Sequence, residues 1–304
     1  MPDLTQIPVW KKPRTVLITG ATGGIGSALA ESYAAQGQVL ILHGRDTTRL
    51  AELSQRCEAL GARVVTLTFD LRDACVVIRE LRQISQREPI DLALVNAGVT
   101  RMLGDGEAVE SWDAVRAVIG VNIDGALATV AGVLPAMRRR GSGQIALVSS
   151  LAAYFGLPQA PTYSASKAAV KAYGETLRVW LAPQGVAINV VLPGFVETAM
   201  TAGFNGPKPA IIPAERAARH IRKGLARNSP RIVFPRPLAW GTLWLSVLPQ
   251  SLSHWIMGAL GYRAPDLPPK AEDRFGPTLL STGADRAATR GRPTSEQNVT
   301  QRTR

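Results

Sequence analysis

The sequence predicts an α/β fold built on a doubly wound parallel sheet. Short apolar runs of strand length alternate along the chain with longer stretches of helical periodicity. A glycine-rich turn joins the first apolar run to an alanine-rich helical stretch. This alternation is typical of a parallel sheet whose two faces are covered by helices, so we expect one large domain of this class.

The expected elements follow one another in a regular order. Strands are predicted for residues 15–19, 39–43, 64–69, 92–95, 144–149, 187–192 and 231–234. Helices are predicted between them for residues 25–36, 48–60, 74–86, 112–138 and 164–182. Because 46% of the 304 residues are hydrophobic, the chain can bury one large core.

Composition limits the classes of function. Cys57 and Cys75 have no metal-ligand spacing, and residues 1–14 lack the apolar stretch of a signal peptide, so we expect a cytoplasmic protein without a metal site. The formal net charge of +12 favours an anionic partner, such as a phosphorylated ligand, an anionic membrane or nucleic acid. Nucleic acid is not expected, because no zinc-finger spacing or aromatic RNA-binding motif accompanies the charge.

A glycine-rich turn follows the first expected strand and opens the first expected helix. Its spacing, Gly-x-x-x-Gly-x-Gly, is formed by Gly20, Gly24 and Gly26, with Thr22 and Ile25 between them. Glycines let the backbone turn tightly and approach a pyrophosphate, whose charge is stabilised by the amino end of a helix. Close packing of strand and helix is an alternative reason for the same glycines.

The residues after the second expected strand bear on the choice between NAD and NADP. An arginine there neutralises the 2′-phosphate of NADP, whereas an acid at the strand end binds the ribose hydroxyl of NAD. Arg45 therefore favours NADP(H) over NAD(H). Two alternatives stay open: Asp46 can pair with Arg45 or Arg49, and Arg45 can be an ordinary surface residue. Asp70, followed by Leu71 at the end of the third strand, is expected to contact the adenine.

Tyr163 and Lys167 stand four residues apart in an expected helix, and Ser150 lies at the end of the strand before it. Helical residues with this spacing share one face, so the phenol and the ammonium are expected to project into one site. A nearby cation lowers the pKa of a tyrosine, which suits proton exchange near neutral pH. The pair is weak evidence alone, because it occurs by chance on many helices.

Together, these motifs resemble the short-chain dehydrogenase/reductase family over about residues 14–237. The matching residues are the glycine turn of Thr19, Gly20, Gly24 and Gly26, the Asn-Ala-Gly turn of Asn96, Ala97 and Gly98, the tetrad Asn122, Ser150, Tyr163 and Lys167, and the segment containing Pro193, Gly194, Val196 and Thr198. The resemblance implies a Rossmann-like catalytic domain that interconverts a carbonyl and an alcohol by hydride transfer with NADP(H).

The resemblance also implies a role for each member of the tetrad. Tyr163 exchanges the proton on the substrate oxygen, and Ser150 polarises that oxygen through a hydrogen bond. Lys167 binds the nicotinamide ribose and lowers the tyrosine pKa, while Asn122 positions Lys167. The segment that ends at Thr198 holds the nicotinamide carboxamide. Ser149 is the rival to Ser150, but alternation at a strand end and the family spacing favour Ser150.

The segments that frame this site are mainly apolar. Residues 151–162 and the Gly/Pro-rich stretch 199–213 are expected to form the walls and a lid of a pocket for a lipophilic ketone, aldehyde or alcohol. One alternative is reduction of a 3-oxoacyl thioester, whose acidic carrier protein would meet Arg138, Arg139 and Arg140. Another is a non-catalytic protein that senses NADP or acts as a scaffold, but no member of the tetrad is missing.

A basic segment followed by an apolar one comes after the catalytic motifs. Residues 216–236 contain seven basic and no acidic residues, and residues 238–260 contain no Asp, Glu, Lys or Arg. Because Pro249 interrupts the apolar segment, we expect two short helices with apolar stripes containing Trp240, Trp244 and Trp255. These stripes are expected to contact an anionic membrane peripherally, or else the catalytic domain, the substrate pocket or another subunit.

The sequence is expected to divide into four regions. We expect an N-terminal extension over residues 1–13, an NADP-binding catalytic domain over 14–237, an apolar helical extension over 238–261 and a disordered tail over 262–304. The family commonly pairs the helices corresponding to 112–138 and 164–182 across subunits, so a homo-oligomer is expected.

Overall fold

The fold was analysed in a computed structural model of the chain, which describes residues 12–103, 109–204 and 206–262. These residues belong to the first of two compact units, Met1–Asp266. Most of the predicted N-terminal extension and nearly all of the predicted disordered tail lie outside the described residues.

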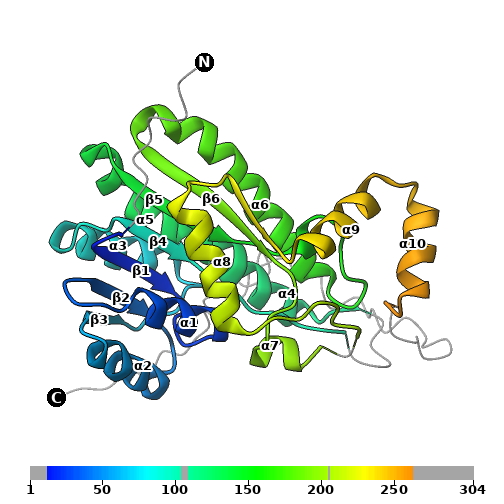
Figure 1. The fold of residues 1–304 in the computed structure, drawn as a ribbon, viewed down its shortest axis with the longest axis horizontal. Coiled ribbons are helices and arrows are strands. Elements are labelled where there is room, and N and C mark those ends of the chain that lie inside the picture. The colour runs from blue at the N-terminus through cyan, green and yellow to red at the C-terminus, as the bar shows by residue number, and fades with distance from the viewer. Residues whose placement is uncertain (1–11, 104–108, 205, 263–304) are drawn as a thin grey trace, which may run out of the picture. The chain divides into compact units, whose positions relative to one another are not determined.

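Seven strands form one parallel sheet in the order β3-β2-β1-β4-β5-β6-β7. The strands are β1 (Thr15–Thr19), β2 (Val39–His43), β3 (Arg63–Leu67), β4 (Leu92–Val95), β5 (Gly143–Val148), β6 (Val186–Pro193) and β7 (Arg231–Phe234). Every neighbouring pair runs parallel, in accordance with the predicted fold class (Figure 1). The order reverses between β1 and β4, and a ligand cleft is expected at the carboxyl ends of the strands there.

Helices cover both faces of the sheet. They are α1 (Gly24–Tyr33), α2 (Thr47–Ala59), α3 (Ala74–Arg87), α4 (Trp112–Ile119), α5 (Gly125–Arg140), α6 (Pro161–Leu181), α7 (Ala199–Ala202), α8 (Ala214–Ala226), α9 (Arg236–Val247) and α10 (Gln250–Ala259). Alternation within β2 shows the two layers: Leu40 and Leu42 pack in the cluster that contains α1, α2 and α8, whereas Ile41 packs with α3, α5 and α6.

The long helix predicted over residues 112–138 is interrupted. A π-helical turn, η1 (Gly120–Asp124), separates α4 from α5. Such turns rotate the side chains that follow and are frequent at functional sites. By length and composition, the continuous stretch Trp112–Arg140 is the one described helix that could span a membrane, but α5 buries its apolar side chains against α3 and the sheet. It is therefore a core helix of this domain.

The apolar extension forms two helices, α9 and α10, as the interruption at Pro249 predicts (Figure 1). Leu238 and Ala239 of α9 pack against Leu151 and Leu192. The Ser253 hydroxyl of α10 donates a 2.8 Å hydrogen bond to the Leu245 carbonyl oxygen of α9. The pair is thus attached to the catalytic domain beside β7 and the segment after β5.

Candidate active site

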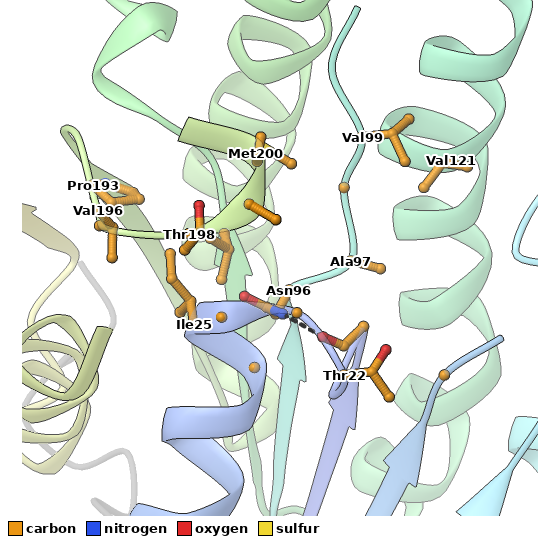
Figure 2. A pocket seen from close by; sticks show the side chains of 18 of the residues that line it. Thr22, Ile25, Asn96, Ala97, Val99, Val121, Pro193, Val196, Thr198 and Met200 are labelled. Carbon is orange, nitrogen blue, oxygen red and sulfur yellow. Dashed lines mark hydrogen bonds between the residues drawn. The ribbon is translucent and has the colours of Figure 1, made fainter. Parts of the chain in front are cut away.

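A cleft of about 430 Å³ opens at the carboxyl ends of the strands, where the strand order reverses. Figure 2 shows it between Ile25, Val196 and Thr198 on one side and Val99 and Val121 on the other. Every residue predicted to contact the cofactor lines this cleft: Gly20, Thr22, Gly24, Ile25, Gly26, Arg45, Asp70, Leu71, Asn96, Ala97, Gly98, Tyr163, Lys167, Pro193, Gly194, Val196 and Thr198.

The glycine turn is held against the loop after β4. Gly20 has a φ of 64°, and a Cβ added to it would lie 2.7 Å from the Ala97 Cα, so no other residue fits without displacement. The Asn96 amide donates 3.1 Å hydrogen bonds to the carbonyl oxygens of Thr19 and Gly20. Figure 2 shows Asn96 at the glycine turn with one of these bonds as a dashed line. These contacts fix the first and fourth strand ends relative to each other.

The amino end of α1 is suited to a phosphate group. Its N-cap, Gly23, supplies no side-chain hydrogen bond, and its first turn has no acidic residue. By contrast, α2, α3 and α4 are capped by the side chains of Asp46, Asp73 and Ser111. The first N–H groups of a helix lack intrahelical partners and attract anions. The glycine turn and this helix end therefore fit the pyrophosphate of a dinucleotide.

Asp46, the acidic residue next to Arg45, caps the amino end of α2. The Asp46 carboxylate accepts a 3.0 Å hydrogen bond from the Arg49 backbone N–H and lies 3.4 Å from the Arg49 Nε. Among the described residues Arg45 has no ion pair, and it lies exposed on the cleft wall. Asp46 is thereby engaged as a helix cap, and Arg45 is left as an available positive charge at the end of β2.

Asp70 and Leu71 lie at the other edge of the cleft. Hydrogen bonds from the Arg72 side chain and backbone N–H lower the pKa of Asp70 to about 2, so the carboxylate is ionised at neutral pH. Leu71 is buried, and a Cβ added to Gly125 would lie 2.9 Å from its side chain. Asp70 is thus paired with Arg72, and Leu71 is packed closely against Gly125.

The two serines at the end of β5 point to different environments. The Ser149 hydroxyl is buried and donates a 2.6 Å hydrogen bond to the Lys167 carbonyl oxygen. The Ser150 side chain hydrogen-bonds to the Tyr163 phenol and also accepts a 3.1 Å bond from the Ala152 N–H. Ser149 thus ties β5 to α6, while Ser150 faces the tyrosine.

Asn122 and Lys167 lie behind the tyrosine. The Asn122 Oδ1 accepts a 2.8 Å hydrogen bond from the Val99 N–H, and its Nδ2 donates 2.9 Å bonds to the Val99 carbonyl and the Ser166 hydroxyl. Lys167 Nζ donates a 3.0 Å bond to the Val148 carbonyl oxygen. A Cβ added to Gly98 would lie 3.1 Å from that Nζ and 3.4 Å from Asn122 Oδ1, so glycine allows the two side chains to come close.

The electrostatics differ from the sequence expectation. Burial lowers the pKa of Lys167 from 10.5 to about 8. Burial raises the pKa of Tyr163, and the hydrogen bond from Ser150 opposes that rise. The predicted net lowering of the tyrosine pKa is not found, because burial outweighs the effect of Lys167, whose ammonium lies 5.7 Å from the centre of the tyrosine ring and donates its hydrogen bond to the Val148 carbonyl oxygen.

A second cavity, of about 200 Å³, adjoins the cleft. Ser150 and Tyr163 line both cavities. The other walls of the second cavity are mostly apolar and come from the segment after β5, the segment after β6, and α9 and α10: they include Leu151, Phe155, Leu157, Phe195, Met200, Phe204, Leu238, Leu245, Met257 and Tyr262. This apolar pocket is therefore the place where a substrate can meet the tyrosine.

Comparison with known proteins decides the family. The model of the short chain dehydrogenase family matches residues 14–208, which include the whole tetrad and the glycine turn. The chain belongs to the short-chain dehydrogenases. It is accordingly a nicotinamide-dependent oxidoreductase that acts on CH–OH groups.

Several relatives and solved structures resemble this short-chain dehydrogenase. An uncharacterized oxidoreductase of Myxococcus xanthus is 36% identical over 241 residues, which cover 79% of this chain and 94% of that protein. The 11-beta-hydroxysteroid dehydrogenase 1A of Arabidopsis thaliana is 32% identical over 262 residues, covering 80% and 74%. A short-chain dehydrogenase from Sphingobium yanoikuyae in complex with NADPH is 27% identical, with a TM-score of 0.67 and coverage of 86% and 99%.

Some residues that line the site of this short-chain dehydrogenase were not predicted from the sequence. Val99 and Val121 line the cofactor cleft, and Leu245, Met257 and Tyr262 line the apolar pocket. The position of Val99 directly after the Asn-Ala-Gly turn was a usable signal, whereas nothing in the sequence shows which face of α9 turns inward. The predicted pocket segment 199–213 includes two residues that do not line the pocket. Ile211 lies outside it, and Ile212 is buried in the core, where it forms a β-bridge with Val196.

Proposed function

We propose that this enzyme interconverts a lipophilic ketone or aldehyde and the corresponding alcohol with NADP(H). The single observation that carries the proposal is that Ser150 and Tyr163 lie at the junction of a dinucleotide cleft and an apolar pocket. A carbonyl oxygen held there can accept hydrogen bonds from both hydroxyl groups, while the rest of the substrate occupies the apolar pocket.

The side chains of the enzyme carry out the proton transfer. When bound, the nicotinamide supplies the hydride to the carbonyl carbon or accepts it from the alcohol. The Tyr163 hydroxyl gives a proton to the substrate oxygen in reduction and removes it in oxidation. Ser150 donates a hydrogen bond to the same oxygen. Lys167, whose pKa of about 8 lies near neutrality, returns a proton to the tyrosine through solvent and would hold the nicotinamide ribose when the cofactor is bound, and Asn122 fixes the loop at Val99 beside it.

Arg45 supports a preference for NADP(H) over NAD(H). Its guanidinium lies exposed on the cleft wall, and Asp46 is held by Arg49 and does not neutralise it. A free guanidinium at this position suits a second phosphate. The similar enzyme from Sphingobium yanoikuyae, in complex with NADPH, agrees with this choice.

The apolar pocket supports a lipophilic substrate. Its walls carry aromatic and aliphatic side chains, and the hydroxyl groups of Ser150 and Tyr163 are at one end. The Arabidopsis relative is named for activity on a hydroxysteroid, which is a large apolar alcohol. The acyl-carrier alternative has less support, because Arg140 donates a hydrogen bond to the Ile90 carbonyl oxygen and Arg138 lies over the Trp180 ring.

We also propose a cytoplasmic homo-oligomer. Cys57 and Cys75 are both free thiols. Val179 and Trp180 of α6 are 68% and 56% exposed, which is unusual for large apolar side chains on one helix and suits contact with a second copy. Light scattering of the purified chain measures the number of copies directly.

A substrate screen tests the proposed function. The purified enzyme is assayed for oxidation of NADPH and of NADH with polycyclic ketones, short ketones, sugars and 3-oxoacyl thioesters. The proposal predicts that kcat/KM is highest for an apolar ketone with NADPH. Turnover of acyl thioesters alone, or of sugars alone, would contradict it. Tight binding of NADPH without turnover of any carbonyl would favour a non-catalytic nucleotide sensor.

A further inference from the structure

We propose that α9 and α10 form a docking surface for an anionic phospholipid bilayer and that the lipophilic substrate enters its pocket from this bilayer beneath the same two helices. The docking part stands independently, whereas the entry part rests on the proposed function. Three features of the molecule support it: the outward side chains of the two helices, the charge beside them and the cavity below them.

The outward sides of both helices expose large apolar side chains. Trp240, Trp244 and Val247 of α9 are 60%, 63% and 68% exposed, and Trp255 of α10 is 71% exposed. On α9 these residues follow helical spacing, so they form one continuous stripe. Single exposed apolar residues are ordinary, but three tryptophans on two adjoining helices are not. Tryptophan is the side chain that prefers the membrane–water interface.

A basic groove adjoins this stripe. Lys223, Arg227 and Arg236 line it together with Trp240 and Leu243, and none of its lining residues is acidic. Among the described residues these three cations have no ion pair, whereas Arg231 in the same groove is paired with Glu175. The sequence has no Asp or Glu between Glu215 and Asp266. Positive charge next to exposed tryptophan matches the phosphates and the interface of an anionic leaflet.

The opposite sides of the same helices form the roof of the substrate pocket. Leu238, Thr242 and Leu245 of α9 and Met257 of α10 line that pocket. The residues after α10 also touch the lid, since the Tyr262 hydroxyl donates a 2.9 Å hydrogen bond to the Pro207 carbonyl oxygen. A bilayer in contact with the outward sides would therefore be separated from the pocket by one layer of helices.

Charge distinguishes the bilayer from other occupants of this surface. A second copy docked through the same face would bring its own basic groove, and like charges repel. Residues 263–304 contain 8 Lys or Arg and 5 Asp or Glu, so their net charge of 8 − 5 = +3 has the same sign as the groove. An anionic lipid surface neutralises the groove and also covers the tryptophans.

Vesicle sedimentation of the full chain tests the docking. Vesicles of phosphatidylglycerol and phosphatidylcholine are compared with vesicles of phosphatidylcholine alone and with inorganic phosphate in solution. Two variants carry the test: Trp240→Ser/Trp244→Ser/Trp255→Ser and Lys223→Gln/Arg227→Gln/Arg236→Gln. The matched control is Leu60→Ser/Val109→Ser, which removes two side chains that are 53% and 62% exposed outside this surface. Circular dichroism checks that each variant is folded.

The proposal predicts that the wild type sediments with anionic vesicles and is released by salt. Each of the two surface variants should lose about tenfold or more in partitioning, while the control keeps it. Three results would overturn the docking: wild-type protein that stays in solution, tryptophan variants that sediment like the wild type, and binding of inorganic phosphate without binding of vesicles. Loss of self-association in the tryptophan variants without any vesicle binding would show that a second copy occupies the surface.

Activity then tests substrate entry separately. With the substrate dissolved in vesicles, the tryptophan variant should turn over more slowly than the wild type, while both should have equal kcat/KM for a small water-soluble ketone. Equal rates with the vesicle-borne substrate would overturn the entry part and leave the docking intact. Absence of turnover with every carbonyl would overturn the proposed function and leave the sedimentation result unaffected.

Discussion

The ammonium of Lys167 lies 5.7 Å from the centre of the Tyr163 ring and donates its 3.0 Å hydrogen bond to the Val148 carbonyl oxygen. The two side chains share one face of α6, as their spacing predicts, but the ammonium donates its hydrogen bond to a carbonyl oxygen of β5 and not to the phenol. Burial controls the pKa of both groups and shifts them in opposite directions: the pKa of Lys167 falls from 10.5 to about 8, and the pKa of Tyr163 rises from 10.0. The lysine thus becomes the easier of the two to deprotonate.

The lowered pKa of Lys167 predicts a pH dependence of stability. Between its folded pKa of about 8 and its unfolded value of 10.5, only the unfolded chain holds the proton on this lysine. Since the unfolded state then binds more protons, the free energy of unfolding rises with pH in this window. We expect a rise of about 2 kcal/mol between pH 8 and 10 from this group. Urea denaturation of the wild type and of Lys167→Met measures it. Parallel pH profiles for the two proteins would contradict the prediction.

The serine pair predicts opposite effects of two neighbouring substitutions. Ser150→Ala removes the hydroxyl that faces Tyr163, so kcat should fall by about 10- to 1,000-fold while the fold is retained. Ser149→Ala removes a buried 2.6 Å bond to the Lys167 carbonyl, so the free energy of unfolding should fall by about 1 kcal/mol with a smaller loss of kcat. Steady-state kinetics and denaturation on both variants check this. The reverse pattern would assign the catalytic hydroxyl to Ser149.

Arg45 predicts a change in cofactor preference. In Arg45→Ala the KM for NADPH should rise about tenfold or more, because a charge-assisted contact to the second phosphate is lost, while the KM for NADH changes little. Arg56→Ala is the control, since Arg56 is paired with Glu31 and does not line the cleft. An equal change for both cofactors would exclude Arg45 as the residue that distinguishes them.

The position of α9 over the pocket predicts a change in substrate size. Leu245 lines the apolar pocket, whereas Leu243 of the same helix is 40% exposed. Leu245→Trp should raise the KM for a polycyclic ketone about tenfold and leave a short ketone unaffected, because the larger ring fills part of the cavity. Leu243→Trp should leave both unaffected. Similar effects of the two substitutions would contradict the assignment of this cavity as the substrate pocket.

Much of the fold could be predicted from the sequence. The apolar runs predicted the bounds of β1, β2, β4 and β7 correctly. The inner strands β1, β2 and β4 are almost entirely buried and therefore mainly apolar, whereas the edge strand β7 begins at the exposed Arg231 and lies between Pro230 and Pro235. The helix predicted over 112–138 was correct in extent but not in form. Its π-helical turn contains Asn122, whose side chain is hydrogen-bonded to Val99 and Ser166, and such contacts between segments distant in the sequence cannot be read from helical periodicity.

Other features of the site required the three-dimensional structure. Helical spacing predicted that the tryptophan stripe of α9 is one face of a helix, but not that this face points outward. The inward face is instead formed by Leu238, Thr242 and Leu245, whose smaller side chains fit above the pocket. The same limit applies to Lys167, since spacing places its side chain on the face of Tyr163 but does not reveal the Val148 carbonyl that it binds.

The central claim is that the Tyr163 hydroxyl exchanges the proton with the substrate oxygen. Tyr163→Phe should lower kcat for the preferred ketone by about 100- to 10,000-fold, while NADPH binding, measured by fluorescence titration, changes little. Tyr154→Phe is the matched control, because Tyr154 lies in the segment after β5 but lines neither the cleft nor the apolar pocket. A Tyr163→Phe enzyme that retains the wild-type kcat would contradict the mechanism.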